Sequence, residues 1–270
     1  MTNVSTHRFT AVVLAADRTA QDPVSLSAGV ACKALAPVGG RPMVLRVLDA
    51  LAGSDQVGHC ILCGPAEAVV QREPLLQERL AASSLHWLPP AATPSTSVLT
   101  ALAAVPAGTP VLVTTADHAL LRPEMVDYFC REAVGADCDV VAALASHRQI
   151  MAKYPGMRRT RIRFRNGDFC GCNLFAFLTP AGHAAADFWR RVENERKRPA
   201  KMLGALGWIV VLRYLLGRLS LEDALRHVSR RMGLRAGVVL MPFPEAAVDV
   251  DSPGDLDIAR RIASRFECRA

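Results

Sequence analysis

The sequence contains no apolar segment long enough to cross a lipid bilayer. Its most apolar stretch, Leu206–Leu212, is cut by Arg213, whereas a spanning helix needs about 20 apolar residues in succession. Internal repeats, heptad arrays and collagen-like periods are also absent. The first eight residues hold no apolar stretch of the signal-peptide type, so a cytoplasmic protein is expected.

A disulfide or zinc framework is not indicated either. The chain has eight cysteines, but it is long and lacks a secretion signal, so reduced thiols are expected. Cys60 and Cys63 lie within an apolar run that predicts a buried strand, and no second Cys or His pair follows at zinc spacing. Cys170 and Cys172 are equally isolated. We therefore expect core cysteines rather than metal ligands.

Aromatic residues are scarce, 6% of the chain. The net charge of +7 is concentrated in two clusters, five arginines in 158–165 and six cations in 190–201. Such clusters suit phosphate, nucleic acid or an anionic membrane surface, and a solvated helix face is an alternative for the second cluster. Phe164 alone interleaves the arginines, which is too little for a base-stacking platform, so no nucleic-acid partner is expected.

What the sequence does have is a large apolar fraction, 51% of 270 residues, which predicts a sizeable core. Short apolar runs alternate with amphipathic segments over the first 145 residues. This alternation predicts βαβ units and an α/β fold with a doubly wound, mostly parallel sheet. Strands are expected at 9–16, 57–63, 85–88, 110–115 and 139–145, and helices at 42–52, 66–82, 95–105 and 124–134. No domain-boundary linker is visible, so residues 1–270 are expected to form a single domain.

The pattern changes after residue 145. Strands are expected at 160–165 and 173–177 around the turn Asn166-Gly167, then helices at 180–198, 200–217 and 220–232, strands at 238–241 and 247–250, and a helix at 253–266. The region 180–235 is expected to be a helical insertion or a cap. Its two apolar helices are expected to bury against each other. Alternatively, they expose an apolar groove beside a basic patch, which would suit a peripheral membrane contact.

Functional side chains are expected at the carboxyl ends of the strands, where open parallel sheets bind ligands. The first strand is followed by Asp17, a long loop and Lys33, the 110–115 strand by Asp117, and the 247–250 strand by Asp251. Asp117, Asp251 and Lys33 are therefore expected to meet in one crevice. Mg²⁺ prefers carboxylates together with substrate phosphates, and a lysine there neutralises charge on a phosphoryl group. A nucleophile elbow and a Walker P-loop are both absent, so no covalent nucleophile is expected.

Four segments resemble a known family in the same order. Segments 9–16, 33–43, 111–118 and 248–256 look like parts of the nucleotidyltransferases related to molybdenum cofactor guanylyltransferase and the sugar-phosphate cytidylyltransferases. The resemblance implies a glycosyltransferase-A-like, Rossmann-like α/β fold. It also implies Mg²⁺-dependent transfer of a nucleoside monophosphate from an NTP, CTP or GTP, to a phosphorylated small molecule or lipid head group, with release of pyrophosphate.

The resemblance also implies roles for individual residues. Lys33, Asp117 and Asp251 would be catalytic, and the two aspartates would hold Mg²⁺. The nucleotide would be bound by Ala15, Ala16 and Arg18 in the first loop, by Lys33, and by Ser97 near the start of the 95–105 helix. Ser97 is equally compatible with an ordinary helix cap, and Ser95 or Thr96 is expected as the N-cap.

The acceptor is expected near the arginine-rich segment. If 160–165 is a strand, Arg161 and Arg163 share a face and form a cationic row fit for an acceptor phosphate. A solvated edge strand protected from aggregation by its charges is the alternative. The resemblance implies an asparagine-bearing strand beside the acceptor, which makes Asn173 a candidate.

The first loop departs from the family pattern Leu-Ala-Ala-Gly-x-Gly-x-Arg, in which glycines let backbone amides approach the phosphates. The segment from Leu14 to Ala20 has no glycine and places Asp17 beside the triphosphate. Either Arg18 and the longer loop cradle the phosphates differently, or nucleotide binding has been lost. The second alternative is a catalytically degenerate nucleotide- or ligand-binding protein on the same fold.

The sequence leaves open the roles of two residues that neighbour the predicted metal ligands. His118 either touches substrate or is a plain loop histidine. Asp249 is a possible extra acid, but it is expected to turn to the face opposite Asp251 if both residues are extended. The sequence does not indicate an oligomeric state.

Overall fold

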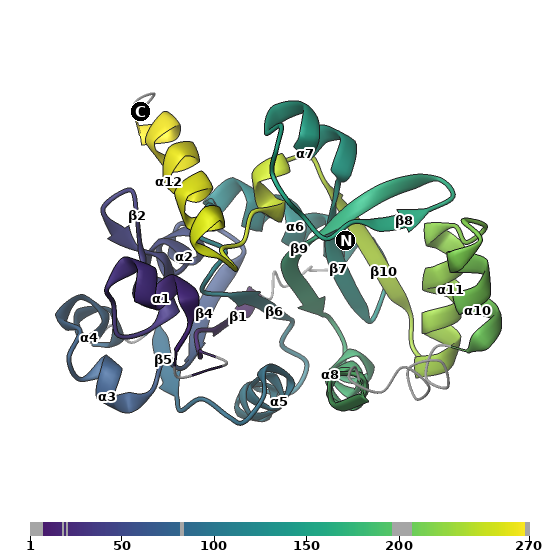
Figure 1. Cartoon of the computed structure of the whole chain (residues 1–270). Helices are drawn as coiled ribbons and strands as arrows, with labels where there is room; N and C mark the ends of the chain where they lie inside the picture. The colour runs from purple at the N-terminus through teal and green to yellow at the C-terminus, as the bar shows by residue number, and fades with distance from the viewer. Residues whose placement is uncertain (1–7, 18, 20, 82–83, 196–206, 268–270) are drawn as a thin grey trace.

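The computed structural model describes residues 8–17, 19, 21–81, 84–195 and 207–267. Its centre is an eight-stranded sheet of order β10-β7-β9-β6-β1-β4-β5, with β8 paired to β9 off this path (Figure 1). β9 is antiparallel to β6 and β7, and the other pairs along the path are parallel. The strands are β1 (Phe9–Leu14), β4 (Val57–Cys63), β5 (Leu85–Leu88), β6 (Val111–Thr115), β7 (Val140–Ser146), β8 (Ile162–Phe164), β9 (Gly167–Phe177) and β10 (Ala236–Met241). The expected doubly wound, mostly parallel α/β sheet is therefore confirmed.

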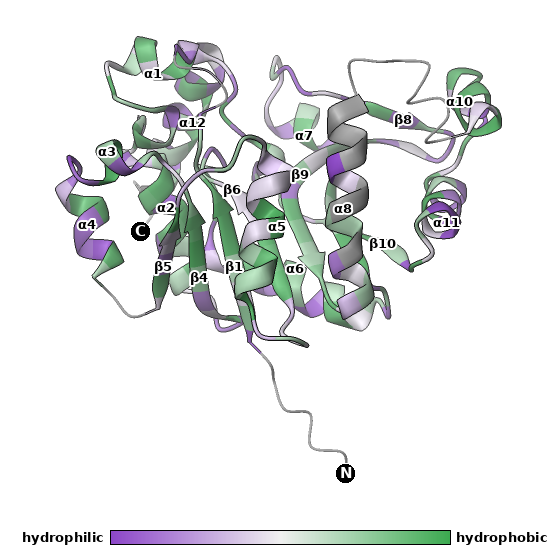
Figure 2. Cartoon of the chain, turned by 90° about the horizontal axis from the view of Figure 1, so that it is seen from below, coloured by the Kyte–Doolittle hydropathy of each residue, from purple (hydrophilic) through white to green (hydrophobic). Residues whose placement is uncertain are grey.

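Helices cover both faces of this sheet. α2 (Met43–Ala52), α6 (Pro123–Gly135) and α12 (Pro253–Glu267) share one apolar core, and α5 (Pro94–Ala104) and α8 (Pro180–Glu195) lie together on the other face (Figure 2). Along β1, Ala11 and Val13 face the first core and Val12 the second, because side chains alternate along a strand. A sheet buried on both faces explains why its strands are nearly continuous apolar runs.

The long first loop contains more structure than the sequence analysis expected. It holds α1 (Pro23–Ala28) and the 3₁₀ helix η1 (Lys33–Leu35). Asp22 caps α1 by accepting a hydrogen bond from Val24 N at 2.8 Å, and Pro23 takes the first helical position. This is a standard helix start. The polar loop expected over residues 17–32 therefore contains a short helix that was not predicted.

Prolines and caps also shifted other helix boundaries. The helix expected at 66–82 is divided into α3 (Glu67–Val70) and α4 (Pro74–Leu80), because Pro74 cannot continue a helix from the preceding turn. α5 begins at Pro94, and its N-cap is Thr93, whose Oγ1 accepts from Thr96 N at 3.2 Å. The expected Ser95 or Thr96 cap was therefore wrong.

The strand expected at 247–250 does not form. The 3₁₀ helix η2 (Pro244–Ala247) ends where the strand was expected to begin, and residues 248–250 belong to no strand of the described sheet. Val250 N donates to the carbonyl oxygen of Asp117 at 3.1 Å. This contact brings Asp251 to the end of β6 without strand pairing. Two other short elements are the ribbon formed by β2 (Pro37–Val38) and β3 (Arg41–Pro42), and the helix α7 (His147–Lys153).

The 180–235 region contains α8, α10 (Trp208–Leu215) and α11 (Leu221–Met232). The expected end of the first helix, 196–198, and start of the second, 200–206, lie outside the described residues. α10 has no buried residue, so the expectation that it buries its apolar side chains against α11 was wrong. Among the described helices, none is long and apolar enough to cross a membrane.

Candidate active site

An open cleft of about 570 Å³ lies at the carboxyl ends of β1 and β6. Its walls come from the first loop, the end of β6, β9, α8 and the chain after η2. This is the edge at which open parallel sheets bind ligands. All three residues predicted to be catalytic, Lys33, Asp117 and Asp251, line it together.

Lys33 links the two aspartates. Its Nζ lies 2.6 Å from Asp117 Oδ2 and 3.3 Å from Asp251 Oδ1. Asp117 is oriented by Thr115, whose Oγ1 donates to Asp117 Oδ1 at 2.5 Å. The structure thus brings together residues that are 84 and 218 positions apart in the sequence.

The charge on Lys33 is maintained by its neighbours. Burial opposes the charge, but the two carboxylates and their hydrogen bonds outweigh it and raise the pKa of the lysine. The side chain of Lys33 is therefore a fixed positive charge between Asp117 and Asp251 at neutral pH.

The cleft is acidic overall. Its described lining includes five aspartates and a single lysine; the aspartates are Asp17, Asp22, Asp117, Asp249 and Asp251. One of these carboxylates, Asp249, is paired with Arg159, and the remaining excess of negative charge disfavours a polyanion such as a triphosphate unless a cation binds with it. Two carboxylates that already share one ammonium ion can also share a divalent cation, so the donor set fits Mg²⁺.

Asp17 has a structural role that the sequence did not reveal. Its carboxylate accepts from Lys33 N at 3.0 and 3.2 Å, and so it fixes the start of η1 across 16 residues of loop. Burial raises the pKa of Asp17 in spite of this hydrogen bond. Ala15 and Ala16 line the cleft as predicted, whereas Arg18 lies outside the described residues.

Gly64 allows the end of β4 to approach this loop closely. It has φ +82°, and a Cβ added to it would lie 3.1 Å from Ala16 N and 3.2 Å from Ala15 C. A larger residue would be strained at this φ and would force the backbone of Ala15 and Ala16 to shift. The shape of the glycine-free first loop thus depends partly on a glycine that directly follows the neighbouring strand.

The acceptor candidate Asn173 lines the cleft on β9. Its Nδ2 donates to Asp249 Oδ2 at 2.8 Å, and Asp249 also forms an ion pair with Arg159. The expectation that Asp249 faces away from Asp251 was wrong, because it assumed a strand where none forms. Arg159 was missed, since nothing in the sequence distinguishes it from its four arginine neighbours.

The other two acceptor candidates do not line the cleft. Arg161 forms an ion pair with Asp168 at 3.3 Å. Arg163 lies directly across from Asp168 in the antiparallel ladder between β8 and β9. Arg163 N also faces Tyr214 OH at 3.5 Å. The structure therefore separates Arg161 and Arg163 from Asn173.

Ser97 is buried and does not line the cleft. Its Oγ accepts from Ala91 N at 3.1 Å, which fixes the loop before α5. Pro94, at the start of the same helix, lines the cleft. The structure thus places Ser97 behind this wall of the site, where it holds the loop.

An aromatic wall was not anticipated from the sequence. Phe175 on β9 and Trp189 on α8 both line the cleft, and their ring centroids are 5.9 Å apart with planes inclined by 34°. Trp189 lies in a helix that was expected to belong to an insertion, so nothing in the sequence marked it as a residue of the site. The cleft therefore combines a charged side with a flat apolar one.

His118 lies neither in the cleft nor on an exposed loop. It is 1% exposed, and burial lowers its pKa to about 4. Its Nδ1 lies 3.5 Å from Thr114 Oγ1. His118 is not among the residues that line the cleft, which does not favour substrate contact. It lies in the loop after β6, as the alternative expected, but its side chain is buried there.

The seven cysteines that the structure describes are free thiols in or beside the core. Burial raises the pKa of Cys60 and Cys63 to about 12, so neither is an accessible thiolate. Across the described residues no group of three or more His, Cys, Asp and Glu side chains is placed to hold a metal by itself. Cys170 and Cys172 are 1% and 2% exposed, so burial supports the core interpretation of both cysteine pairs.

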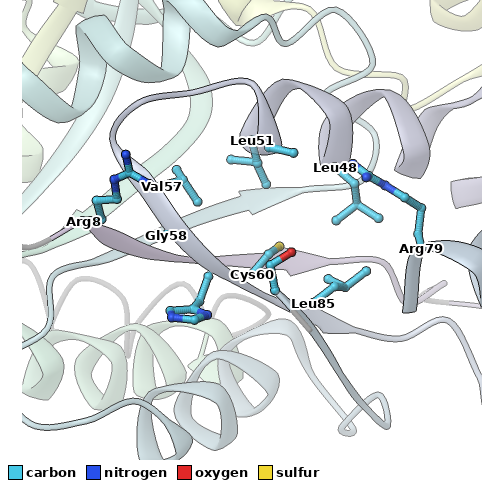
Figure 3. Close-up of a pocket in the computed structure, with 11 residues that line it drawn as sticks. Arg8, Leu48, Leu51, Val57, Gly58, Cys60, Arg79 and Leu85 are labelled. Carbon is cyan, nitrogen blue, oxygen red and sulfur yellow. The ribbon is translucent and has the colours of Figure 1, made fainter. Parts of the chain in front are cut away.

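A smaller hollow of about 210 Å³ lies at the amino-terminal edge of the sheet (Figure 3). Arg8 and Arg79 stand on opposite sides of it, with Leu48 and Leu51 between them. Arg79 is already paired with Asp49 at 3.1 Å. The cleft at the carboxyl edge, with its lysine and two aspartates, is the stronger candidate for the active site.

The fold and this site define a protein of the nucleotidyltransferase superfamily. The chain belongs to the family described as the MobA-like NTP transferase domain, whose sequence model matches residues 11–236. A search of curated proteins gave no significant match.

Solved structures with the same fold support this assignment. A hypothetical transferase from Thermus thermophilus is 32% identical, with a TM-score of 0.77 over 92% of this chain and 99% of that one. 4-Diphosphocytidyl-2C-methyl-D-erythritol synthase from Anaerococcus prevotii is 12% identical (TM-score 0.55, 97% and 100% covered). CMP:2-keto-3-deoxy-manno-octonic acid synthetase in complex with CTP is 11% identical (TM-score 0.58, 96% and 99% covered). The last two likenesses are of fold.

Proposed function

We propose that the protein is a Mg²⁺-dependent nucleotidyltransferase that transfers a nucleoside monophosphate from CTP or GTP to a phosphorylated acceptor. The observation that carries the proposal is the contact of Lys33 with both Asp117 and Asp251 in one cleft. Family membership supports the reaction class. A phosphorylated small molecule or lipid head group is the proposed acceptor.

The metal ligands in this proposal are Asp117 and Asp251. Mg²⁺ typically takes one or two protein carboxylates and completes its coordination with substrate phosphates and water. Two carboxylates suit that pattern, and among the residues that the structure describes no third acidic or imidazole side chain is placed to complete a metal site with them. When bound, Mg²⁺ would supply positive charge to the triphosphate.

The chain's own residues then bind and orient the nucleotide. Lys33 neutralises charge on the phosphates, and the backbone of Ala15 and Ala16 lies against them. The aromatic wall of Phe175 and Trp189 provides a flat surface for the base or the sugar. Asp17 keeps η1, and hence Lys33, in position through its bonds to Lys33 N.

In the proposed reaction, an oxygen of the acceptor phosphate attacks the α-phosphorus in line. The bond between the α-phosphorus and the oxygen that bridges to the β-phosphate breaks, and pyrophosphate leaves with the electron pair. A phosphate monoester is ionised near neutral pH, so no protein base is required. Asn173 is the proposed acceptor contact, because it lines the same cleft as the first loop but belongs to another element, β9.

The proposal is tested by pyrophosphate release. Wild-type protein is incubated with Mg²⁺, each of the four NTPs and a library of phosphate esters, and Asp117→Ala is the control. We expect release with one NTP and one ester class, and its loss in Asp117→Ala. Absence of NTP-dependent release, or full activity in the variant, would defeat the proposal.

A second candidate function is favoured by the first loop. Asp17 occupies the backbone N–H of Lys33 and adds a carboxylate to the cleft, in a family whose loop normally offers free amides to phosphates. A binding protein without catalytic activity would follow if this arrangement excludes triphosphates. Thermal unfolding separates the two, since a bound NTP with Mg²⁺ raises the melting temperature and an excluded one leaves it unchanged.

A further inference from the structure

α10 carries an apolar stripe on its outer face. Five large apolar side chains are between 46% and 74% exposed and recur at helical spacing: Trp208, Ile209, Leu212, Leu215 and Leu216. Positions separated by three, four and seven residues lie on one side of a helix, so the five form a continuous surface. Soluble proteins expose single apolar residues routinely, but contiguous patches mark interaction sites.

The opposite face of α10 holds the helix to the protein. The ring of Tyr214 stands against Phe164 of β8, with centroids 6.3 Å apart. Arg213 pairs with Asp223 of α11 at 2.8 Å. Val210 and Val211 on this side are half-buried. The outward direction of the stripe is therefore fixed by contacts on the other side of the helix.

The surroundings of the stripe are basic. The described residues 207–235 contain six arginines and two acidic residues. The adjoining 158–165 segment contacts α10 through Phe164 and Arg163. It adds three exposed arginines, Arg158, Arg163 and Arg165, since Arg159 and Arg161 are paired with Asp249 and Asp168. Figures 1 and 2 show α10 and α11 side by side at one end of the molecule, with an apolar α10 next to a largely polar α11.

We propose that the α10 stripe docks the protein on an anionic lipid surface, with the helix lying in the plane of the interface. An apolar helix face next to an excess of arginine is the pattern of interfacial helices, which combine apolar insertion with attraction to acidic head groups. A tryptophan at the edge of the stripe fits the membrane–water boundary. With eight residues, α10 spans only about 12 Å and lies on the bilayer rather than across it.

Charge favours lipid over a second copy of this chain as the occupant. Two copies meeting through this face would bring two arginine-rich surroundings together, which is unfavourable. A nucleic acid would neutralise the arginines but would leave the five apolar side chains without a partner. An anionic bilayer satisfies both parts of the surface.

Vesicle sedimentation tests the proposal with the full-length protein. The vesicles are phosphatidylcholine alone, or phosphatidylcholine mixed with phosphatidylglycerol. We expect binding to the mixed vesicles, weakened by added salt because the electrostatic part is screened. The double variant Leu212→Gln, Leu215→Gln should bind about tenfold less, since it removes two of the apolar anchors.

The matched control is Leu26→Gln, Leu75→Gln. These leucines are 67% and 45% exposed on α1 and α4, away from α10, and their replacement should leave vesicle binding unchanged. Trp208 emission should shift to the blue on binding, and Trp208→Phe should abolish that shift. Gel filtration is run in parallel to measure the oligomeric state of each variant.

No binding to the mixed vesicles would overturn the proposal, as would equal binding by the α10 variant and the wild type. A dimer that the α10 variant converts to monomer, without vesicle binding by the wild type, would assign the stripe to a second copy instead. Vesicle binding is measured without nucleotide, so this result is independent of the proposed transferase activity.

Discussion

Arg159 and Asp249 form an ion pair in the wall of the cleft, although they stand 90 residues apart in the sequence. Both side chains are largely buried, at 11% and 13% exposure. Asn173 Nδ2 contacts the same carboxylate at 2.8 Å. Asp249 is thus held between a guanidinium and an amide, and the pair connects the arginine-rich segment with the site that contains Asp251.

The Arg159–Asp249 pair predicts a specific pattern of stability. Arg159→Met leaves a buried carboxylate without its cation and should lower the free energy of unfolding by about 3 kcal/mol. The double variant Arg159→Met, Asp249→Leu should lose less than this, because it removes both charges. Denaturant unfolding measures all three proteins. A double variant that is less stable than Arg159→Met would contradict this account of the pair.

Lys33→Met should separate catalysis from metal binding. The variant lacks the charge that neutralises the phosphates, so pyrophosphate release should fall by about 10²-fold or more. Without nucleotide, the same variant should bind Mn²⁺ more tightly, because the ammonium group no longer occupies the space between Asp117 and Asp251. Calorimetry measures the affinity for Mn²⁺, and Asp117→Asn is the control that should lose metal binding. Weaker Mn²⁺ binding by Lys33→Met would place the metal elsewhere.

Asp17 should act through its hydrogen bonds rather than its charge. Asp17→Ala removes the acceptor for Lys33 N and should cost about 1 kcal/mol of stability, whereas Asp17→Asn keeps an acceptor and should not. Loss of the negative charge in Asp17→Asn should also lower the KM for NTP. Steady-state kinetics and denaturant unfolding measure the two effects.

The pH dependence of the Asp17 variants has a defined sign. The pKa of Asp17 is higher in the folded state than its ordinary value of 3.8, so the folded protein binds this proton more tightly than the unfolded chain. Wild-type stability therefore declines, relative to Asp17→Asn, as the pH rises through and above 3.8. The opposite trend in unfolding measurements would refute the assigned effect of burial on Asp17.

His118 should make the protein sensitive to mild acid. Burial lowers its pKa from 6.5 to about 4, so the folded state resists its protonation. The stability that this provides is complete above pH 6.5 and is lost as the pH falls toward 4, by roughly 3 kcal/mol. In His118→Met this part of the pH dependence should disappear. An unchanged profile in the variant would assign the acid sensitivity to other groups.

Ser97→Ala distinguishes a positioning role from direct nucleotide contact. The variant leaves the Ala91 N–H without its acceptor and should destabilise the protein by about 1 kcal/mol. Because Ser97 lies behind the cleft wall, the KM for NTP should change less than in Lys33→Met. A large increase in KM without a loss of stability would instead support direct binding by Ser97.

The buried sheet and the central site residues were predictable from the sequence for the same reason. Fully buried strands such as β1 and β6 appear as short apolar runs, and the rule that ligands lie beyond their carboxyl ends points to Lys33 and Asp117. Asp251 was included because it follows a predicted strand, and that strand does not form. The residue still reaches the same edge of the sheet, because Val250 N donates to the carbonyl oxygen of Asp117.

Other features depend on tertiary contacts that no local pattern encodes. Arg159 is one of five arginines in eight residues, and only the folded chain selects it as the partner of Asp249. Asp17 was expected only to place a negative charge beside the triphosphate. Its hydrogen-bond partner, Lys33 N, lies 16 residues away, so nothing in the sequence indicated its structural role. The exposed apolar face of α10 was only an alternative to burial against α11, because helical periodicity shows that a helix has an apolar face but not what covers it.

A crystal structure of the protein soaked with Mg²⁺ and a mixture of CTP and GTP tests the central claim most directly. The account predicts a metal ion bound at about 2.1 Å by Asp117 and Asp251, with the triphosphate against Lys33 and the first loop. A nucleotide bound away from these three residues, or their failure to bind metal in the presence of nucleotide, would contradict it.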